Sequence, residues 1–349
     1  MPNADLRRLL DEIAEQPRVV ARVLDEQRNA AAGVADEIRR RDPAAIVLVA
    51  RGSSDNAAVY GRYLFEVRNR RLTSLAAPSS LTLYGGGPRL DNTLVIGVSQ
   101  SGQGEDVVEY VRAARAQGAA TVAIVNETDS PLAAAAESVL ACLAGPELSI
   151  PATKTVTAQM TLLALISAQL QGSDPRILEP LPDALGQAVA HRPAAASVAQ
   201  GLGSHTLGSV IGRGFAFPPA LEIALKLKET AYTPAEPFSA ADFLHGPVAL
   251  VEEDYAALVV DVGGRSSTAA TDTVAAIRAR SGQPVVLRAG DVAPLDPDTP
   301  GLALRVGLDE TFAPIVALVL GQLVAVELAL ARGLDPSQPR GLRKVTSTR

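Results

Sequence analysis

The sequence contains little of what disulfide frameworks and metal sites require. Its 349 residues include one cysteine, three histidines and no tryptophan. One cysteine cannot form a disulfide within the chain, which fits a reducing compartment, and we expect a cytoplasmic protein. The histidines are too few and too scattered for a metal-ligand spacing, so neither a metal nor another cofactor is expected.

Long apolar runs and blocks of like charge are also absent. The N-terminal segment carries charges of both signs at helical spacing, without the apolar core of a signal peptide, and predicts an amphipathic helix. The longest apolar stretch, residues 315–331, is shorter than a membrane span and contains Gln322 and Glu327, which favours a buried helix. The 32 basic and 38 acidic residues are dispersed, so we expect neither nucleic acid nor a membrane as a partner.

What is present is a repeated alternation of apolar β-rich runs with helical stretches. With 47% hydrophobic residues the chain can bury a large core. Alternation of this kind predicts parallel strands joined by crossover helices. Strands are predicted at 45–50, 73–77, 93–99, 120–126 and 138–144, and then, where the pattern restarts, at 208–214, 255–262, 283–289 and 302–306. We therefore predict an α/β protein with an internal duplication and two mostly parallel sheets.

Composition also suggests where these parts begin and end. Both halves place Arg-Gly directly after a strand and before a helix, at Arg51 and at Arg213. The expected parts are an N-terminal helical segment at 1–42, a first α/β unit at 43–172, a helical linker at 173–200, a second unit at 201–332 and an irregular tail at 333–349.

Two hydroxyl-rich loops follow predicted strands. Ser99, Gln100 and Ser101 precede a helix that begins near Glu105, and residues 51–58 place further serines at another strand–helix junction. Hydroxyl groups beside a helix N-terminus bind anions, although a serine that only caps its helix would explain either loop alone. Since neighbouring parallel strands end at one edge of a sheet, the two loops together favour a phosphorylated ligand. No Walker-type or GxGxxG fingerprint follows a strand, which disfavours a nucleotide.

Charged residues of the second half leave two interpretations open. Glu222, Lys226 and Glu229 share one helix face, a spacing typical of solvated surface pairs but equally able to line a cleft. His245 precedes Gly-Pro, and an isolated histidine can be structural or catalytic. The segment 145–159 is either an ordinary capped loop or part of a site.

Six segments occur in the order ARGSSDNA, SQSG, GPELSIPATKT, ALEIALKLKE, AEPFSAADFLHGP and PRGLRKVT. From about residue 45 to the C-terminus, this combination resembles the isomerase half of glutamine:fructose-6-phosphate amidotransferases and their stand-alone relatives, the SIS-type (sugar isomerase) glucosamine-6-phosphate deaminases. The resemblance implies two tandem flavodoxin-like SIS units, an N-terminal helix and a C-terminal tail that closes over the ligand.

The resemblance also implies roles for individual residues. Glu229 matches the base that moves a proton between C1 and C2, and Lys226 a lysine beside it. His245 matches a ring-opening acid or base supplied by the neighbouring subunit of a homodimer. Lys344 matches a tail lysine that can form a Schiff base. The residues implied to bind the phosphate and the sugar are Ser53, Ser54, Ser99, Gln100, Ser101, Ile150, Thr153 and Arg340.

Two positions depart from the amidotransferase pattern. Gly104 stands where those enzymes have a phosphate-binding threonine, and Ala152 where they have a serine that contacts the sugar. Ser53, Thr153 or Glu105 could compensate.

The start of the sequence bears on the expected reaction. It has no N-terminal cysteine and no room for a glutaminase domain, so glutamine-dependent synthesis is disfavoured. We expect deamination of a hexosamine 6-phosphate, foremost glucosamine 6-phosphate to fructose 6-phosphate and ammonia, by C1–C2 proton transfer and imine hydrolysis. The alternatives are an aldose–ketose isomerase or a deglycase acting on a 6-phosphosugar, and, in another class, a non-catalytic sugar-phosphate sensor.

Overall fold

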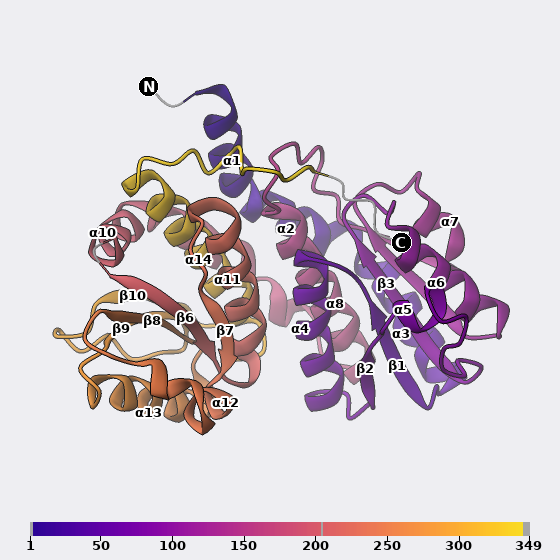
Figure 1. The fold of residues 1–349 in the computed structure, drawn as a ribbon. Coiled ribbons are helices and arrows are strands. Elements are labelled where there is room, and N and C mark those ends of the chain that lie inside the picture. Colours follow the sequence, from indigo (N-terminus) through magenta and orange to yellow (C-terminus); the bar gives the residue numbers. More distant parts are fainter. Residues whose placement is uncertain (1–2, 204, 345–349) are drawn as a thin grey trace. The chain divides into compact units, whose positions relative to one another are not determined.

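Two parallel sheets organise the chain (Figure 1). The computed structural model describes residues 3–203 and 205–344, and these fall into two compact units. The N-unit comprises residues 18–147, 154–179 and 343–344. The C-unit comprises residues 3–17, 148–153 and 180–342.

The N-unit is built on a five-stranded parallel sheet in the order β2-β1-β3-β4-β5. The strands are β1 (Ala45–Val49), β2 (Thr73–Leu75), β3 (Thr93–Ser99), β4 (Ala120–Val125) and β5 (Ser138–Ala141). One face carries α3 (Arg28–Arg41), α4 (Ser53–Val67) and α8 (Lys154–Gln171). The other carries α5 (Ser79–Thr82), α6 (Glu105–Ala116) and α7 (Pro131–Ala135). Because both faces are covered, the inner strands are apolar at successive positions, and every residue of β4 is buried.

The C-unit repeats this plan with the order β10-β9-β8-β6-β7. Its strands are β6 (Thr206–Gly212), β7 (Glu236–Ser239), β8 (Tyr255–Asp261), β9 (Gln283–Gly290) and β10 (Gly301–Arg305). Helices α11 (Phe217–Ala231) and α14 (Ala313–Ala331) cover one face, with α9 (Leu181–Ala190) and α10 (Arg192–Leu202) packed on α14. Helices α12 (Ala240–His245) and α13 (Ser267–Arg278) cover the other face.

The remaining elements are short or N-terminal. They are α1 (Ala4–Ala14), α2 (Gln16–Glu26) and the 3-10 turns η1 (Pro175–Leu178), η2 (Gly214–Ala216), η3 (Pro247–Leu250) and η4 (Gly264–Ser266).

Both sheets have the same strand order when each is counted from its own first strand, so the predicted duplication of a parallel α/β unit is confirmed. Two details differ from the prediction. The N-terminal segment forms α1, α2 and α3 in place of one helix, and Pro17 occupies the second position of α2, where no backbone N–H is needed. The short edge strand β7 was not predicted, because its sequence EPFS contains a proline and lacks an alternating pattern.

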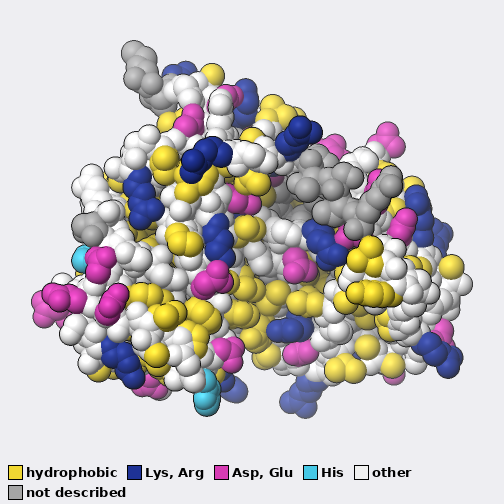
Figure 2. Space-filling model, in the orientation of Figure 1, with side chains coloured by type: hydrophobic (Ala, Val, Ile, Leu, Met, Phe, Trp, Pro, Cys, Tyr) yellow, Lys and Arg dark blue, Asp and Glu magenta, His cyan; other side chains and the backbone are white. Residues whose placement is uncertain are grey.

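Helix α14 forms the core of the C-unit. Among residues 3–203 and 205–344 it is the one helix that is long and apolar enough to cross a membrane by length and composition, and 89% of its apolar window is buried inside the protein. Its close packing on α11 depends on Gly321, where a Cβ atom would lie 2.2 Å from Ile223 Cγ1. On the face shown in Figure 2, acidic and basic side chains are interspersed among hydrophobic ones.

Candidate active site

The two hydroxyl-rich loops lie at the topological switch point of the N-unit sheet. The chain proceeds outward from β1 to β2 in one direction and from β3 to β5 in the other, so the connections after β1 and β3 diverge. In open α/β sheets a ligand binds in the crevice at the carboxyl ends of such strands. Ser53 follows β1 and Ser99 ends β3, which places both predicted loops at this edge.

Hydrogen bonds fix the shape of the Ser-Gln-Ser-Gly loop, residues 99–102. The backbone N–H of Gly102 donates to Ser99 Oγ at 3.0 Å, and the carbonyl oxygen of Gln100 accepts from the N–H of Asn126 at 3.1 Å. Gly102 has a φ of 64°, and a Cβ atom there would lie 2.2 Å from Ser130 Oγ. The side chains of residues 99–101 remain partly exposed, as a ligand-binding loop requires.

The loop after β1 contributes a cation that the sequence analysis did not single out. Arg51 Nη2 lies 2.6 Å from Oδ2 of Asp106, which is in the first turn of α6. Ser54 is buried and its hydroxyl accepts a hydrogen bond from Gln159 Nε2 at 3.0 Å, whereas Ser53 is partly exposed. Burial raises the pKa of Asp55, and the charge of Arg51 opposes that rise.

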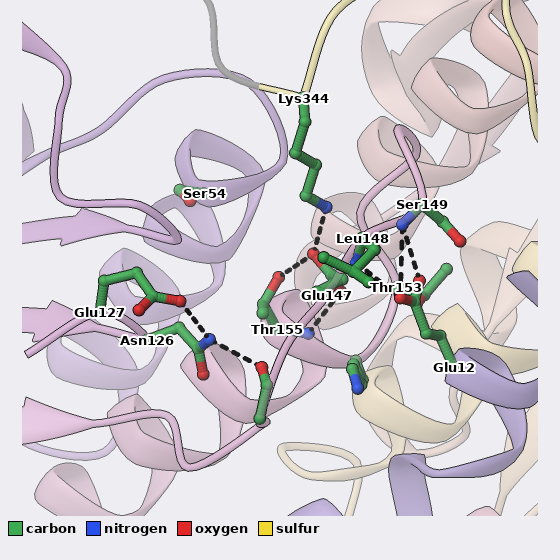
Figure 3. Close-up of polar contacts among 12 residues, drawn as sticks. Glu12, Ser54, Asn126, Glu127, Glu147, Leu148, Ser149, Thr153, Thr155 and Lys344 are labelled. Atoms are coloured by element: carbon green, nitrogen blue, oxygen red, sulfur yellow. Dashed lines mark hydrogen bonds and ion pairs between the residues drawn. The ribbon is translucent and has the colours of Figure 1, made fainter. Parts of the chain in front are cut away.

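The start of α8 holds the tail lysine (Figure 3). The carboxylate of Glu147, whose side chain is 0% exposed, accepts from Thr155 N at 3.0 Å, from Thr155 Oγ1 at 2.8 Å and from Lys344 Nζ at 2.7 Å. A carboxylate at a helix N-terminus is favoured by the helix dipole. Lys344 is therefore tied to the N-unit by a buried anion. The sequence showed Glu147 in a polar segment but gave it no role.

Residues 148–153 belong to the C-unit, where Glu12 organises them. Its buried carboxylate accepts from the N–H of Leu148 at 2.6 Å and from that of Ser149 at 3.3 Å (Figure 3). Ile150 is partly exposed. The side chain of Thr153 is buried, and its carbonyl oxygen accepts from Gln322 Nε2 at 3.3 Å. Of the two predicted sugar contacts in this segment, Ile150 is the more accessible.

On α11 the three charged residues form a cluster that is largely buried. Lys226 Nζ lies 3.5 Å from Glu222 Oε1 and is hydrogen-bonded to Glu229 Oε2. The side chains of Lys226, Glu222 and Glu229 are 3%, 2% and 21% exposed, so the solvated-surface interpretation of this face is wrong. Burying charges costs several kcal/mol per ion unless they are paired, and such clusters occur preferentially at functional sites.

Arg340 lies at the end of the same helix. Its guanidinium lies 4.0 Å from the ring centroid of Tyr232, and the backbone N–H of Arg340 donates to the Tyr232 hydroxyl at 2.9 Å. Tyr232 is the left-handed residue that ends α11, three residues after Glu229. The tail therefore brings Arg340 to the turn of α11 that carries Glu229.

His245 is not brought to Glu229 within the C-unit. It is exposed at the end of α12, which packs on β7 and α13, on the sheet face opposite α11. No contact between the side chains of His245 and Glu229 is recorded in the part of the chain that the structure describes.

Two observations bear on metal chemistry and on thiol chemistry. Over residues 3–203 and 205–344 no group of three or more His, Cys, Asp and Glu side chains is placed to hold a metal ion. Cys142 is buried, and this burial, followed by the charge of Glu147, raises the pKa of its thiol. The N-unit has a hydroxyl-rich loop at a helix N-terminus, and the C-unit has a partly exposed carboxylate, Glu229, bonded to a buried lysine.

Comparison with known proteins agrees with this geometry. The SIS domain family matches residues 41–168 and 209–332. Over 347 residues the chain is 33% identical to glutamine–fructose-6-phosphate aminotransferase (isomerizing) of Thermococcus kodakarensis. The match covers 96% of this chain and 57% of the aminotransferase, so the chain spans little more than half the length of that relative. A candidate phosphosugar isomerase from Silicibacter pomeroyi DSS-3 is 32% identical with a TM-score of 0.86, covering 94% of this chain and 99% of the other. Glucosamine-6-phosphate deaminase from Thermotoga maritima, 20% identical, shares the fold with a TM-score of 0.75 over 98% of this chain and 100% of the other. The chain belongs to the SIS domain family.

Proposed function

We propose that this protein deaminates a hexosamine 6-phosphate, foremost glucosamine 6-phosphate, to fructose 6-phosphate and ammonia. The observation that carries the proposal is the α11 cluster, in which Glu229 is the most exposed of three charged residues and is bonded to a buried lysine. The name of the matched aminotransferase includes fructose 6-phosphate, and the Silicibacter protein is described as a candidate phosphosugar isomerase. Both names support a sugar phosphate as the ligand.

The chemistry requires a base at one side of the C1–C2 bond. In the open-chain amino sugar, the hydrogen on C2 is made acidic by the neighbouring aldehyde. Glu229 removes this proton and delivers a proton, in part exchanged with solvent, to C1, while the ammonium of Lys226 stabilises the enolate oxygen that forms. This oxygen gains a proton and the nitrogen on C2 loses one. The product is an imine at C2 with a CH2OH group at C1. Water adds to the imine carbon and ammonia leaves, which gives the ketose.

The one thiol in this sequence is not suited to release ammonia from glutamine. Release of ammonia from glutamine by a thiol needs an accessible, ionisable cysteine. Cys142 is buried and its pKa is raised, so it cannot serve as that nucleophile. The proposed reaction needs only the sugar phosphate and water.

The exposed position of His245 supports a second part of the proposal. His245 opens the sugar ring in the site of a neighbouring subunit, so that a homodimer builds each site from two chains. A histidine suits this step because it exchanges protons near neutral pH. Arg340 and Lys344 would then close the tail over the ligand.

One alternative is favoured by a specific observation. The Silicibacter relative, matched over nearly its whole length, is described as a candidate phosphosugar isomerase. An aldose–ketose isomerase would use the same base and the same phosphate loop, but without loss of nitrogen.

Ammonia release distinguishes these reactions. Glucosamine, galactosamine and mannosamine 6-phosphates, together with glucose 6-phosphate and other aldose 6-phosphates, are each incubated with the protein, and ammonia and ketose 6-phosphate are measured separately. The proposal predicts equimolar ammonia and ketose from at least one hexosamine 6-phosphate. Ketose formed only from glucose 6-phosphate or another aldose 6-phosphate identifies an isomerase. If no sugar phosphate reacts, the proposal is wrong.

A further inference from the structure

Arg51 lies at the carboxyl edge of the N-unit sheet, at the switch point where a ligand would bind. It is the second residue after β1 and lies two residues before the start of α4. β1 pairs with β3, the strand that leads into the Ser-Gln-Ser-Gly loop. Its Nη2 lies 2.6 Å from Asp106 Oδ2, and its Nη1 donates to the carbonyl oxygen of Ala50 at 3.3 Å. The side chain is nevertheless 47% exposed, while that of Asp106 is 3% exposed. A buried carboxylate therefore holds part of the guanidinium, and the rest faces solvent.

The charged side chains at the helix N-termini beside Arg51 are acidic, so a bound phosphate needs a positive charge there. The first turns of α4 and α6 carry Asp55, Glu105 and Asp106. A phosphate dianion that approached these helix N-termini would be repelled by the carboxylates. Gly104, which caps α6, supplies no side-chain hydrogen bond. The loop offers hydroxyl groups and backbone N–H groups, but its own residues offer no positive charge.

We propose that Arg51 binds the phosphate group of the sugar substrate and that Asp106 positions its guanidinium for this contact. The inference rests on the proposed action on a 6-phosphosugar and extends it by naming the cation that pairs with the dianion. A guanidinium has five N–H donors in a planar fork, so it can bridge a carboxylate and a phosphate at the same time. Charge-assisted hydrogen bonds of this kind are about twice as strong as neutral ones.

Substitutions at Arg51 test the contact through binding of inorganic phosphate and of glucosamine 6-phosphate, measured by calorimetry. Arg51→Met is expected to raise both dissociation constants about 10- to 100-fold, the range for a lost hydrogen bond between charged groups. Arg51→Lys keeps the charge without the fork and is expected to give a smaller loss. Arg112→Met removes an equal charge from the exposed face of α6 and should change binding less than about twofold.

A double substitution shows whether Arg51 binds the phosphate itself or only neutralises the negative charge of Asp106. If Arg51 only neutralises that carboxylate, Arg51→Met/Asp106→Asn restores wild-type affinity, and the proposal is overturned. If Arg51 binds the phosphate, the double variant stays at least about tenfold weaker than the wild type. Wild-type affinity in folded Arg51→Met also overturns it. A wild-type protein that binds neither glucosamine 6-phosphate nor any other 6-phosphosugar rejects the proposed function itself.

Discussion

The side chain of Glu229 is more exposed than those of Glu222 and Lys226, the two charged residues beside it on α11. Glu229→Gln keeps the size of the side chain but removes the proton acceptor. We expect kcat to fall about 10²- to 10⁴-fold with little change in the KM for the phosphosugar, the range for loss of a general base. Steady-state kinetics measure both constants.

A surface glutamate provides the matched control for that substitution. Glu236 lies 3.4 Å from Lys228, and its side chain is 63% exposed. Glu236→Gln removes the same charge and should leave kcat within about twofold, since exposed ion pairs contribute little. Equal losses in the two variants would mean that the negative charge of this region, and not proton transfer, sets the rate.

Gly102 gives a prediction about stability. Gly102→Ala places a Cβ atom at a φ of 64° and within 2.2 Å of Ser130 Oγ. We expect a loss of about 1–3 kcal/mol in the free energy of unfolding, measured by urea denaturation. Gly104→Ala is the control, because the nearest atom to its Cβ would be 3.7 Å away. An unchanged stability for Gly102→Ala would show that the loop is free to rearrange.

The sequence predicted some of these residues and not others for physical reasons. Serines and a glycine between a strand and a helix predicted where the Ser-Gln-Ser-Gly loop lies, and the structure has it between β3 and α6. That this loop binds an anion stays a prediction. The pair Arg51 and Asp106 is 55 positions apart and forms only because β1 lies beside β3. Spacing on α11 could not tell a solvated face from a buried one, since the difference arises from α14, which packs against it.

Among helices and strands, long apolar runs were predicted well and short edge elements were not. α6 begins at Glu105 as expected, and the five strands of the first half lie where the apolar runs are. β7 is stabilised by hydrogen bonds to β6 and not by a pattern of its own. An element of this kind cannot be found without its partner strand.

Within the N-unit, Glu147 holds Lys344, and this contact can be tested directly. Glu147→Gln weakens the attraction for Lys344, so the tail should open more often. We expect trypsin to cleave after Arg343 and Lys344 about five- to tenfold faster, since proteolysis follows local opening. Glu109→Gln, on the exposed face of α6, should not change this rate. Equal rates in Glu147→Gln and the wild type would show that the ion pair does not hold the tail.

At the scale of the whole molecule, the proposed action of His245 in the site of a neighbouring subunit can be tested by mixing two inactive variants. His245→Ala and Glu229→Gln subunits, each inactive alone, are mixed under conditions that allow exchange. If each site takes His245 from one chain and Glu229 from the other, about a quarter of the wild-type activity should return, assuming random exchange in a symmetric dimer. Absence of recovery after demonstrated exchange would place both residues of a site on one chain.

Proton transfer between C1 and C2 is the central claim, and turnover in deuterium oxide tests it most directly. Glucosamine 6-phosphate is incubated with the protein in D2O, and the fructose 6-phosphate and ammonia formed are measured by NMR and by a coupled assay. We predict deuterium at C1 of the ketose, one ammonia per ketose, and loss of both signals in Glu229→Gln. If the wild type released ammonia without incorporating deuterium, or if Glu229→Gln incorporated it at the wild-type rate, Glu229 could not be the group that moves this proton in exchange with solvent.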